Sequence, residues 1–161
     1  MITVNNIYKQ FDGKEILHDV SAKFYSGKTN LIIGQSGSGK TVLMKCLVGL
    51  LRPDQGKILY DGRDVMAMTP AQTKVLRTEI GMLFQGSALF DSETVLGNVM
   101  FPLRMFTRDN YATCKKRAEF CLERVNLKGV NDLYPSEISG GMQKRVAIAR
   151  AIALNPKYLF C

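Results

Sequence analysis

The chain contains the stretch Gly34-Gln35-Ser36-Gly37-Ser38-Gly39-Lys40-Thr41, and this stretch decides its fold class. The spacing matches G-x-x-x-x-G-K-[ST], a loop that binds the phosphates of nucleotides. Glycines let the backbone curve around an anion, so that successive N–H groups and the positive end of the following helix point at it. Lys40 is then expected to neutralise the β- and γ-phosphates, and the Thr41 hydroxyl to bind Mg²⁺.

The segments on either side of this loop strengthen its interpretation. The apolar run 31–33 precedes it and predicts a strand buried on both faces. Apolar residues at helical spacing follow it and predict a helix over residues 40–51. A merely flexible glycine loop is the alternative, and the strand–loop–helix order disfavours it. The loop alone does not separate GTPases, kinases and transport ATPases.

The remaining pattern predicts an α/β fold with strands at both ends of the chain. Alternating residues predict an antiparallel hairpin of strands 2–11 and 16–24, joined by Asp12-Gly13. Further strands are expected over 57–60, 80–84 and 157–161. Helices are expected over 69–77, over 95–101 with an end at Pro102, over 108–125, and from Ser139 or Gly140 to Leu154. The helical middle predicts a lobe inserted into the α/β core.

Composition and charge exclude several classes of protein. The 161 residues are 46% hydrophobic, which argues against disorder, and no run is long enough to span a bilayer. The N-terminus does not have the pattern of a signal peptide. The net charge of +8 is shared equally: residues 1–84 and 85–161 each hold 11 Lys and Arg and 7 Asp and Glu. The densest cluster, 115–117, is interpreted as a solvated helix face, so no nucleic-acid partner is expected.

Cysteine usage predicts no metal centre. The four cysteines, at positions 46, 114, 121 and 161, form no C-x-x-C pair, and the single histidine, His18, is distant in sequence. Cys114 and Cys121 are seven residues apart, on one face of the expected helix, and they are interpreted as small buried apolar side chains.

A second glycine-containing segment occurs about a hundred residues after the first. Residues 138–143 read Ile-Ser-Gly-Gly-Met-Gln, at the start of the last expected helix. A serine hydroxyl and exposed N–H groups at a helix N-terminus can bind phosphate oxygens. By itself this segment favours an ordinary serine cap with flexible neighbours. Its position after the phosphate loop favours the second anion site.

The two segments together resemble the nucleotide-binding subunit of an ABC transporter, along essentially the whole chain. The resemblance implies a P-loop NTPase (RecA-like) core with an N-terminal antiparallel β subdomain and an inserted α-helical subdomain. It implies that Phe11 stacks on adenine, that residues 34–41 and Val42 form the Walker A site, and that Gln85 is the Q-loop residue. Ser139, Gly140, Gly141 and Met142 match the signature, in which Gln is commoner than Met at the last position and Leu commoner than Ile138 before it.

The resemblance also implies how such a subunit works. ATP and Mg²⁺ would be bound by Lys40, Thr41 and Gln85, and two copies would associate head to tail, with the signature of one covering the nucleotide of the other. Lys40 and Gln85 are the expected catalytic residues. Residues 1–84 would form the β subdomain and Walker A core, 85–139 the helical subdomain, and 140–161 the signature helix and the start of the Walker B strand.

The segment after Gln85 narrows the resemblance. Gly86 to Phe90, Thr94-Val95, Asn98-Val99 and Phe101 to Arg104, with the Ser-Gly-Gly-Met signature, resemble the ATPases of Mla-type phospholipid transporters. These work with an integral membrane permease and MCE-domain proteins, at the cytoplasmic face of the bacterial inner membrane. Other open alternatives are another importer, a lipoprotein-release system, or a nucleotide-binding fragment without turnover. A DNA-repair ATPase is disfavoured, because such proteins usually carry a long insertion between the two motifs and the spacing here leaves no room for one.

The family pattern continues beyond residue 161. It places the Walker B Asp and the catalytic Glu just after the position of Cys161, followed by further core strands. The resemblance therefore implies that the C-terminal part of the core lies outside these 161 residues, and that the fragment hydrolyses ATP slowly and has reduced stability.

Overall fold

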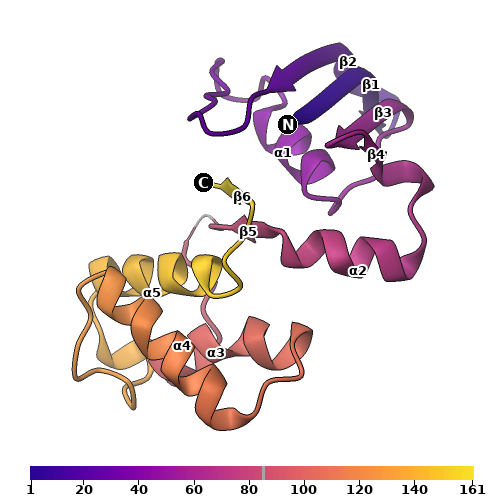
Figure 1. Cartoon of the computed structure of the whole chain (residues 1–161). Helices are drawn as coiled ribbons and strands as arrows, with labels where there is room; N and C mark the ends of the chain where they lie inside the picture. The colour runs from indigo at the N-terminus through magenta and orange to yellow at the C-terminus, as the bar shows by residue number, and fades with distance from the viewer. Residues whose placement is uncertain (85) are drawn as a thin grey trace. The chain divides into compact units, whose positions relative to one another are not determined.

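The structure is a computed structural model that describes residues 1–84 and 86–161. It forms two units, Met1–Lys74 and Val75–Cys161, and the boundary between them falls inside helix α2 (Pro70–Thr78). The colours of Figure 1 follow the chain from the strands of the first unit to the helices of the second. Each unit is described separately below.

The first unit is built on an antiparallel sheet with strand order β2-β1-β3-β4. Its strands are β1 (Ile2–Phe11), β2 (Lys14–Phe24), β3 (Gln55–Tyr60) and β4 (Arg63–Asp64), and the short helix η1 (Val65–Ala67) follows. The expected hairpin is confirmed, since β1 pairs with β2 through the turn at Asp12 and Gly13. Both turn residues have positive φ, 49° and 77°, which suits the right-handed twist of the strands.

Helix α1 (Lys40–Leu47) packs on this sheet and ends earlier than expected. The buried Tyr60 hydroxyl of β3 donates to the Leu47 carbonyl at 2.8 Å, which joins the end of the helix to the sheet. The expectation of a helix to residue 51 was wrong. Gly49 adopts φ 73°, and the N–H groups of Gly49 and Leu50 turn back to the carbonyls of Cys46 and Lys45, a common helix ending.

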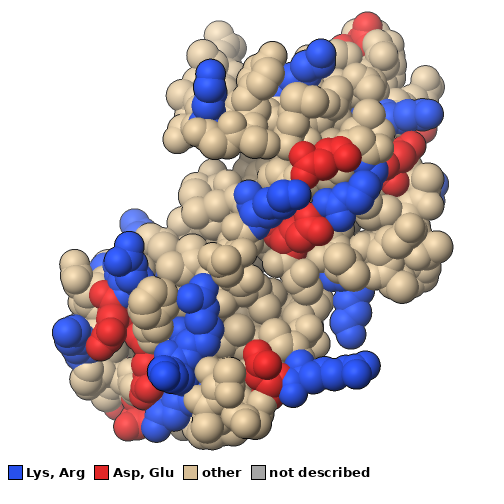
Figure 2. Space-filling view, viewed as in Figure 1, with Lys and Arg blue, Asp and Glu red and all other residues tan. Residues whose placement is uncertain are grey.

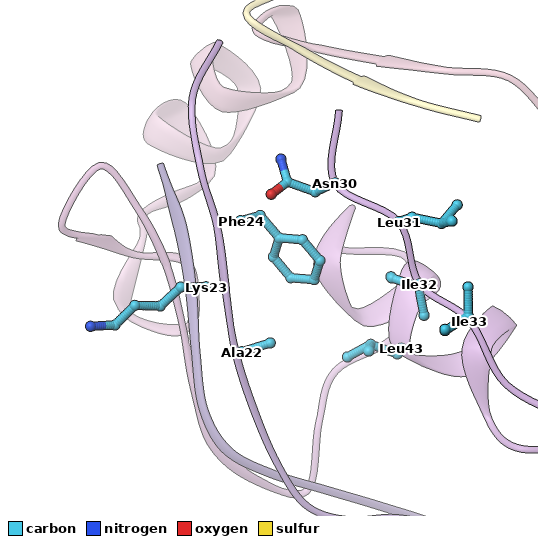
Figure 3. A pocket seen from close by; sticks show the side chains of 8 residues that line it. All are labelled: Ala22, Lys23, Phe24, Asn30, Leu31, Ile32, Ile33 and Leu43. Atoms are coloured by element: carbon cyan, nitrogen blue, oxygen red, sulfur yellow. The ribbon is translucent and has the colours of Figure 1, made fainter. Parts of the chain in front are cut away.

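The segment before the glycine loop differs from the prediction. Residues 31–33 form no strand, and Leu31 and Ile33 are 81% and 80% exposed. Within the described residues of this unit, no strand pairs with them. The segment lies beside the end of β2, where a cleft of about 380 Å³ separates the two. Figure 3 shows Ile32 directed toward Leu43 and Leu31 directed away, so side chains alternate as in a strand while the backbone is unpaired.

The second unit packs three helices together beside a two-stranded parallel sheet. The helices are α3 (Val95–Phe106), α4 (Tyr111–Arg124) and α5 (Gly140–Ile152), with the short helix η2 (Pro135–Glu137) before α5. The strands β5 (Ile80–Met82) and β6 (Tyr158–Phe160) pair in parallel, and they lie within the predicted strands 80–84 and 157–161 but are shorter. Apolar side chains from all three helices fill one core.

Pro102 lies inside α3, and the expectation that it ends the helix was wrong. A proline removes one backbone donor from the helix, but α3 continues for four more residues because Met100 and Leu103, on either side, are buried in the helical core. Helix α4 begins at Tyr111, after the cap Asn110, and not at residue 108. In the described part of the chain no helix is long and apolar enough to cross a membrane.

Candidate nucleotide-binding site

The glycine loop leads into a helix N-terminus where several amides have no acceptor among the described residues. Gly39 caps α1 in the left-handed conformation, φ 88°, and offers no side chain to the first turn. Among the residues that the structure describes, no acceptor receives the N–H groups of Gly37, Gly39, Lys40 or Thr41. Free amides at a helix N-terminus, together with the helix dipole, favour an anion. The loop therefore fits a phosphate group.

Contacts with β2 hold the loop in place. A Cβ on Gly39 would lie 2.9 Å from Leu17 Cδ2 and 3.0 Å from the Ile16 carbonyl oxygen, so the backbone approaches the strand as closely as glycine allows. Gly34 faces the loop itself, because a Cβ there would lie 2.7 Å from Ser38 Oγ. The loop needs glycine at position 39, where φ is positive and the Ile16 backbone is close, whereas at position 34 the Ser38 side chain can turn away from a Cβ.

Lys40 folds back over the loop. Its ammonium group donates to the Gly34 carbonyl at 2.7 Å and to the Gln35 carbonyl at 2.6 Å. A lysine held in this way has its charge next to the free amides, where a phosphate would be bound. Thr41 is exposed in the first turn of α1, and Val42 after it is half-buried. The Thr41 hydroxyl is a hard oxygen ligand that fits Mg²⁺ when phosphate oxygens supply others.

Metal binding by protein groups alone is not indicated. In the part of the chain that the structure covers, His, Cys, Asp and Glu side chains form no cluster of three that could hold a metal ion. A magnesium ion here would therefore depend on the phosphates of the nucleotide for most of its ligands.

Phe11 lies at the tip of the β1–β2 hairpin, in the same unit as the loop. Its ring is 42% exposed, and Lys9 Nζ lies 5.3 Å from its centre. Asp54 fixes this end of β1, because its carboxylate accepts from Lys9 Nζ at 2.7 Å and from the Gln10 N–H at 2.8 Å. These hydrogen bonds lower the pKa of Asp54. The exposed ring is available to stack on a flat base.

The signature segment forms a capped helix N-terminus in the second unit. Ser139 Oγ accepts the Met142 N–H at 3.3 Å, and Gly140 and Gly141 are exposed, with no atom closer than 4.0 Å to a Cβ built on either. Gln143 Nε2 donates to the Pro135 carbonyl at 2.8 Å and fixes the first turn. The glycines leave room for another molecule to approach this backbone.

The expected site residues thus fall into three groups. Phe11 and residues 34–42 both belong to the first unit, and residues 139–142 lie in the second. Gln85, to which the sequence assigns the Q-loop role, lies outside the described residues. A cavity of about 320 Å³ in the second unit, here named the aromatic cavity, is lined by apolar side chains and two arginines, including Phe84, Phe90, Phe101, Phe106, Arg77 and Arg150.

Sequence reasoning missed two residues beside this cavity, Asn98 and Arg150. Asn98 is fully buried in α3, and its side chain bonds to the backbone of Phe90, Glu93 and Thr94. Arg150 donates to carbonyls of the segment that follows Gln85. The sequence did contain a signal for Asn98, which is an amide on the apolar face of a helix. A buried amide requires hydrogen-bond partners, so its position indicated such partners nearby.

Surface charge is mixed in both units. Figure 2 shows Lys and Arg side chains interspersed with Asp and Glu on the face that it presents. Oppositely charged pairs such as Lys9–Asp54 and Arg104–Glu93 contribute to this pattern. The positive charge of the site itself is local and comes from Lys40 and the N-terminus of α1.

Comparison with known proteins agrees with this geometry. The chain is 39% identical over 160 residues to the "probable ribonucleotide transport ATP-binding protein mkl" of Mycobacterium tuberculosis, covering 99% of this chain and 45% of that protein. It is 42% identical over 165 residues to the "methionine import ATP-binding protein MetN 3" of Pectobacterium atrosepticum, covering 100% and 48%. The chain spans about half the length of these curated relatives.

Solved structures match the fold. The dimeric structure of MJ0796, a bacterial ABC transporter cassette, superposes with a TM-score of 0.90 at 32% identity, over 99% of this chain and 72% of that one. The same cassette bound to ADP and Pi gives a TM-score of 0.89 at 30% identity. The fold is therefore that of an ABC ATPase cassette, a P-loop NTPase. The ABC transporter family model matches residues 17–161, and the chain belongs to this family.

Proposed function

We propose that this chain is the ATP-binding part of an ABC transporter subunit that couples ATP binding and hydrolysis to transport. One observation carries the proposal: α1 begins with amides that have no acceptor in the described part of the chain, beside an inward-folded Lys40, and such a site has the shape and charge for nucleotide phosphates. Phe11, at the hairpin tip of the same unit, supplies a surface for the base.

The site residues have different proposed roles in phosphoryl transfer. The loop amides and Lys40 bind and orient the β- and γ-phosphates, so the reacting group is held in line for attack by water. Thr41 contributes an oxygen ligand to Mg²⁺, which supplies charge stabilisation when bound. Gln85 is proposed to orient the metal and the attacking water. These roles require mainly positioning and charge, which these residue types provide.

Nucleotide binding to the chain is the direct test. A fluorescent ATP analogue with Mg²⁺ should bind saturably with one site per chain, and unlabelled ATP should displace it. Because the phosphates carry most of the contacts, AMP should compete far more weakly than ATP or ADP. Saturable binding that AMP displaces as well as ATP would contradict the phosphate-loop assignment.

We also propose that two copies associate head to tail when ATP is bound. The signature is open to a second copy of the chain, because Gly140 and Gly141 are exposed. These glycines and the Ser139 hydroxyl would contact the γ-phosphate of the ATP bound to that copy. Light scattering should show mass increasing on addition of Mg-ATP under conditions that prevent turnover. An unchanged monomer mass at saturating nucleotide, with the site shown to be occupied, would exclude this arrangement for the chain.

The aromatic cavity is proposed to receive a segment of an integral membrane permease. Four phenylalanines provide apolar area, and Arg77 and Arg150 add positive charge to the lining. An apolar helix with an acidic residue beside its apolar face matches this lining. The subunit would accordingly work at the cytoplasmic face of a bacterial inner membrane. Copurification of a membrane protein with the wild-type subunit, lost on Phe101→Glu, tests this contact.

Phospholipid is the proposed substrate, because residues 86–104 and the Ser-Gly-Gly-Met signature resemble Mla-type ATPases, with an MCE-domain protein as a further partner. The names of the similar proteins favour a second candidate, import of a small polar solute. Turnover by the assembled transporter distinguishes the two. Stimulation by phospholipid vesicles supports the first candidate, and stimulation by methionine or ribonucleotides supports the second.

A further inference from the structure

Arg150 joins the helix that begins at the signature to the loop that lines the aromatic cavity. It lies in the last turn of α5, and its guanidinium donates to the Ser87 and Ala88 carbonyls, each at 2.9 Å. A longer contact of 3.5 Å reaches Asn98 Oδ1, and the group lies 5.6 Å from the centre of the Phe90 ring. One side chain therefore contacts the helix, the loop and the cavity.

The loop under this guanidinium has an unusual backbone. Ser87 and Ala88 both have positive φ, 66° and 46°, a conformation that costs free energy in residues with a Cβ. Asn98 fixes the other end of the loop by accepting the Phe90 N–H at 2.8 Å and donating to the Phe90 carbonyl at 3.1 Å. Arg150 and Asn98 thus hold the loop in a strained arrangement from both ends.

The charge of Arg150 has no carboxylate partner among the described residues. Burial lowers the pKa of its guanidinium, which means that the cation is held partly out of water. Backbone carbonyls and an aromatic face stabilise it in place of an ion pair. Such a site is costly, and the number of its contacts indicates a role in positioning the loop.

We propose that Arg150 is a positioning residue that transmits the occupancy of the aromatic cavity to the signature helix α5. A segment bound in the cavity contacts Ala88 and Phe90, the loop shifts against the guanidinium, and the shift acts on α5 through Arg150. Lysine in this position keeps the charge but cannot donate to two carbonyls in the same fork. The proposal rests on the proposed function, since the occupant is a permease segment.

Arg145 provides a matched control on the same helix. Its guanidinium also donates to two backbone carbonyls, those of Val125 at 3.4 Å and Asn126 at 3.1 Å, but it does not line the aromatic cavity. Arg145→Lys therefore tests the general cost of losing a guanidinium that bridges two carbonyls. Only Arg150→Lys disturbs the contact with the cavity loop.

The experiment measures ATP turnover of the complete subunit alone and assembled with its permease. For Arg150→Lys we expect stimulation by the permease to fall about fivefold or more, the usual size of coupling between two sites. The KM for ATP should change less than about twofold, because the phosphate contacts are intact. Arg145→Lys should retain wild-type stimulation. Hydrogen exchange of residues 86–98 should accelerate only in Arg150→Lys.

The possible outcomes separate the two claims. A wild-type complex without ATP turnover contradicts the proposed function, whatever the variants do. Wild-type turnover with equal stimulation in both variants, or with equal losses, overturns the role of Arg150. If Arg150→Lys does not fold, Arg150→Gln removes the buried charge and keeps a donor. Retained stimulation in that folded variant likewise overturns the proposal, and reduced stimulation supports it.

Discussion

The N-termini of α1 and α5 both follow glycine-containing segments, yet they are completed differently. Gly39 gives α1 no side-chain cap, and several amides there have no acceptor among the described residues. Ser139 caps α5 by accepting the Met142 N–H. A serine oxygen satisfies one of the donors that a helix leaves open, whereas glycine satisfies none. The first terminus depends on a ligand for its hydrogen bonds, and the second is stable without one.

This difference separates binding from stability in the two halves of the site. At the start of α1, Lys40 donates to a carbonyl of the loop, and it would exchange this contact for phosphate oxygens. Gly39 lies against strand β2, which cannot move away. Around α5, Ser139 stabilises the helix that presents the signature. Loss of the Lys40 ammonium should therefore change nucleotide affinity, whereas loss of the Ser139 cap should first change local helix stability.

Lys40→Ala should give the largest effect. Removing a charged donor from phosphate oxygens costs about 1.5–3 kcal/mol of binding free energy, roughly a 10- to 150-fold weaker affinity for ATP. A fluorescent nucleotide titration measures the change. Lys45→Ala, on the last turn of the same helix, is the control and should bind normally. Equal losses in both variants would show that general charge, and not the loop geometry, drives binding.

Gly39→Ala should destabilise the first unit by about 1–3 kcal/mol, because a left-handed residue with a Cβ is strained and this Cβ would meet Leu17 and Ile16. Gly37→Ala is matched in backbone, with φ 79°, but nothing lies within 4 Å of its Cβ. Urea unfolding of the two variants isolates the effect of the close approach. Equal losses of stability in the two variants would exclude the close approach to β2 as the cause.

Ser139→Ala should destabilise the second unit by about 0.5–2 kcal/mol through loss of the cap. Nucleotide affinity of the chain should not change, because the loop and Lys40 belong to the other unit. Faster amide exchange in residues 140–143 would locate the effect. A lower affinity for ATP in monomeric Ser139→Ala would contradict the separation of binding from stability. Ser136→Ala, another exposed serine before α5, serves as the control.

Asp54→Asn should give the smallest effect, and one that depends on pH. The folded-state pKa of Asp54 is lowered, so its stabilisation is present above the unfolded-state pKa and is lost as pH falls through the folded-state value. The melting temperature of the variant should be below that of wild type at neutral pH. The two should converge as pH falls below the folded-state pKa, where the carboxyl is protonated. A constant difference across this range would exclude the carboxylate as the cause.

Local sequence signals predicted most elements because each depends on nearby residues. The hairpin follows from alternation and from Asp12-Gly13, and the start of α5 from Ser139. The ends of helices were less predictable. Helix α1 stops at a turn centred on Gly49, and α3 continues through Pro102, since tertiary packing outweighs the local preference.

Long-range contacts explain what the sequence did not reveal. The run 31–33 is apolar enough for a buried strand, but a strand also needs a partner to pair with, and apolarity says nothing about that partner. The Arg150 contacts with Ser87 and Ala88 join residues more than sixty positions apart. A local pattern could flag Asn98 as polar on an apolar face, but it could not identify the partners.

The unpaired segment 31–33 also bears on how the isolated chain behaves when concentrated. Leu31 and Ile33 present apolar side chains to solvent along an extended backbone, a surface on which other chains add as strands. The 161-residue chain should therefore precipitate at a lower ammonium sulfate concentration than expected for a protein of this size with a charge of +8. Leu31→Lys would place a charge on this surface, a common protection of open strand edges, and should restore solubility without touching the phosphate loop.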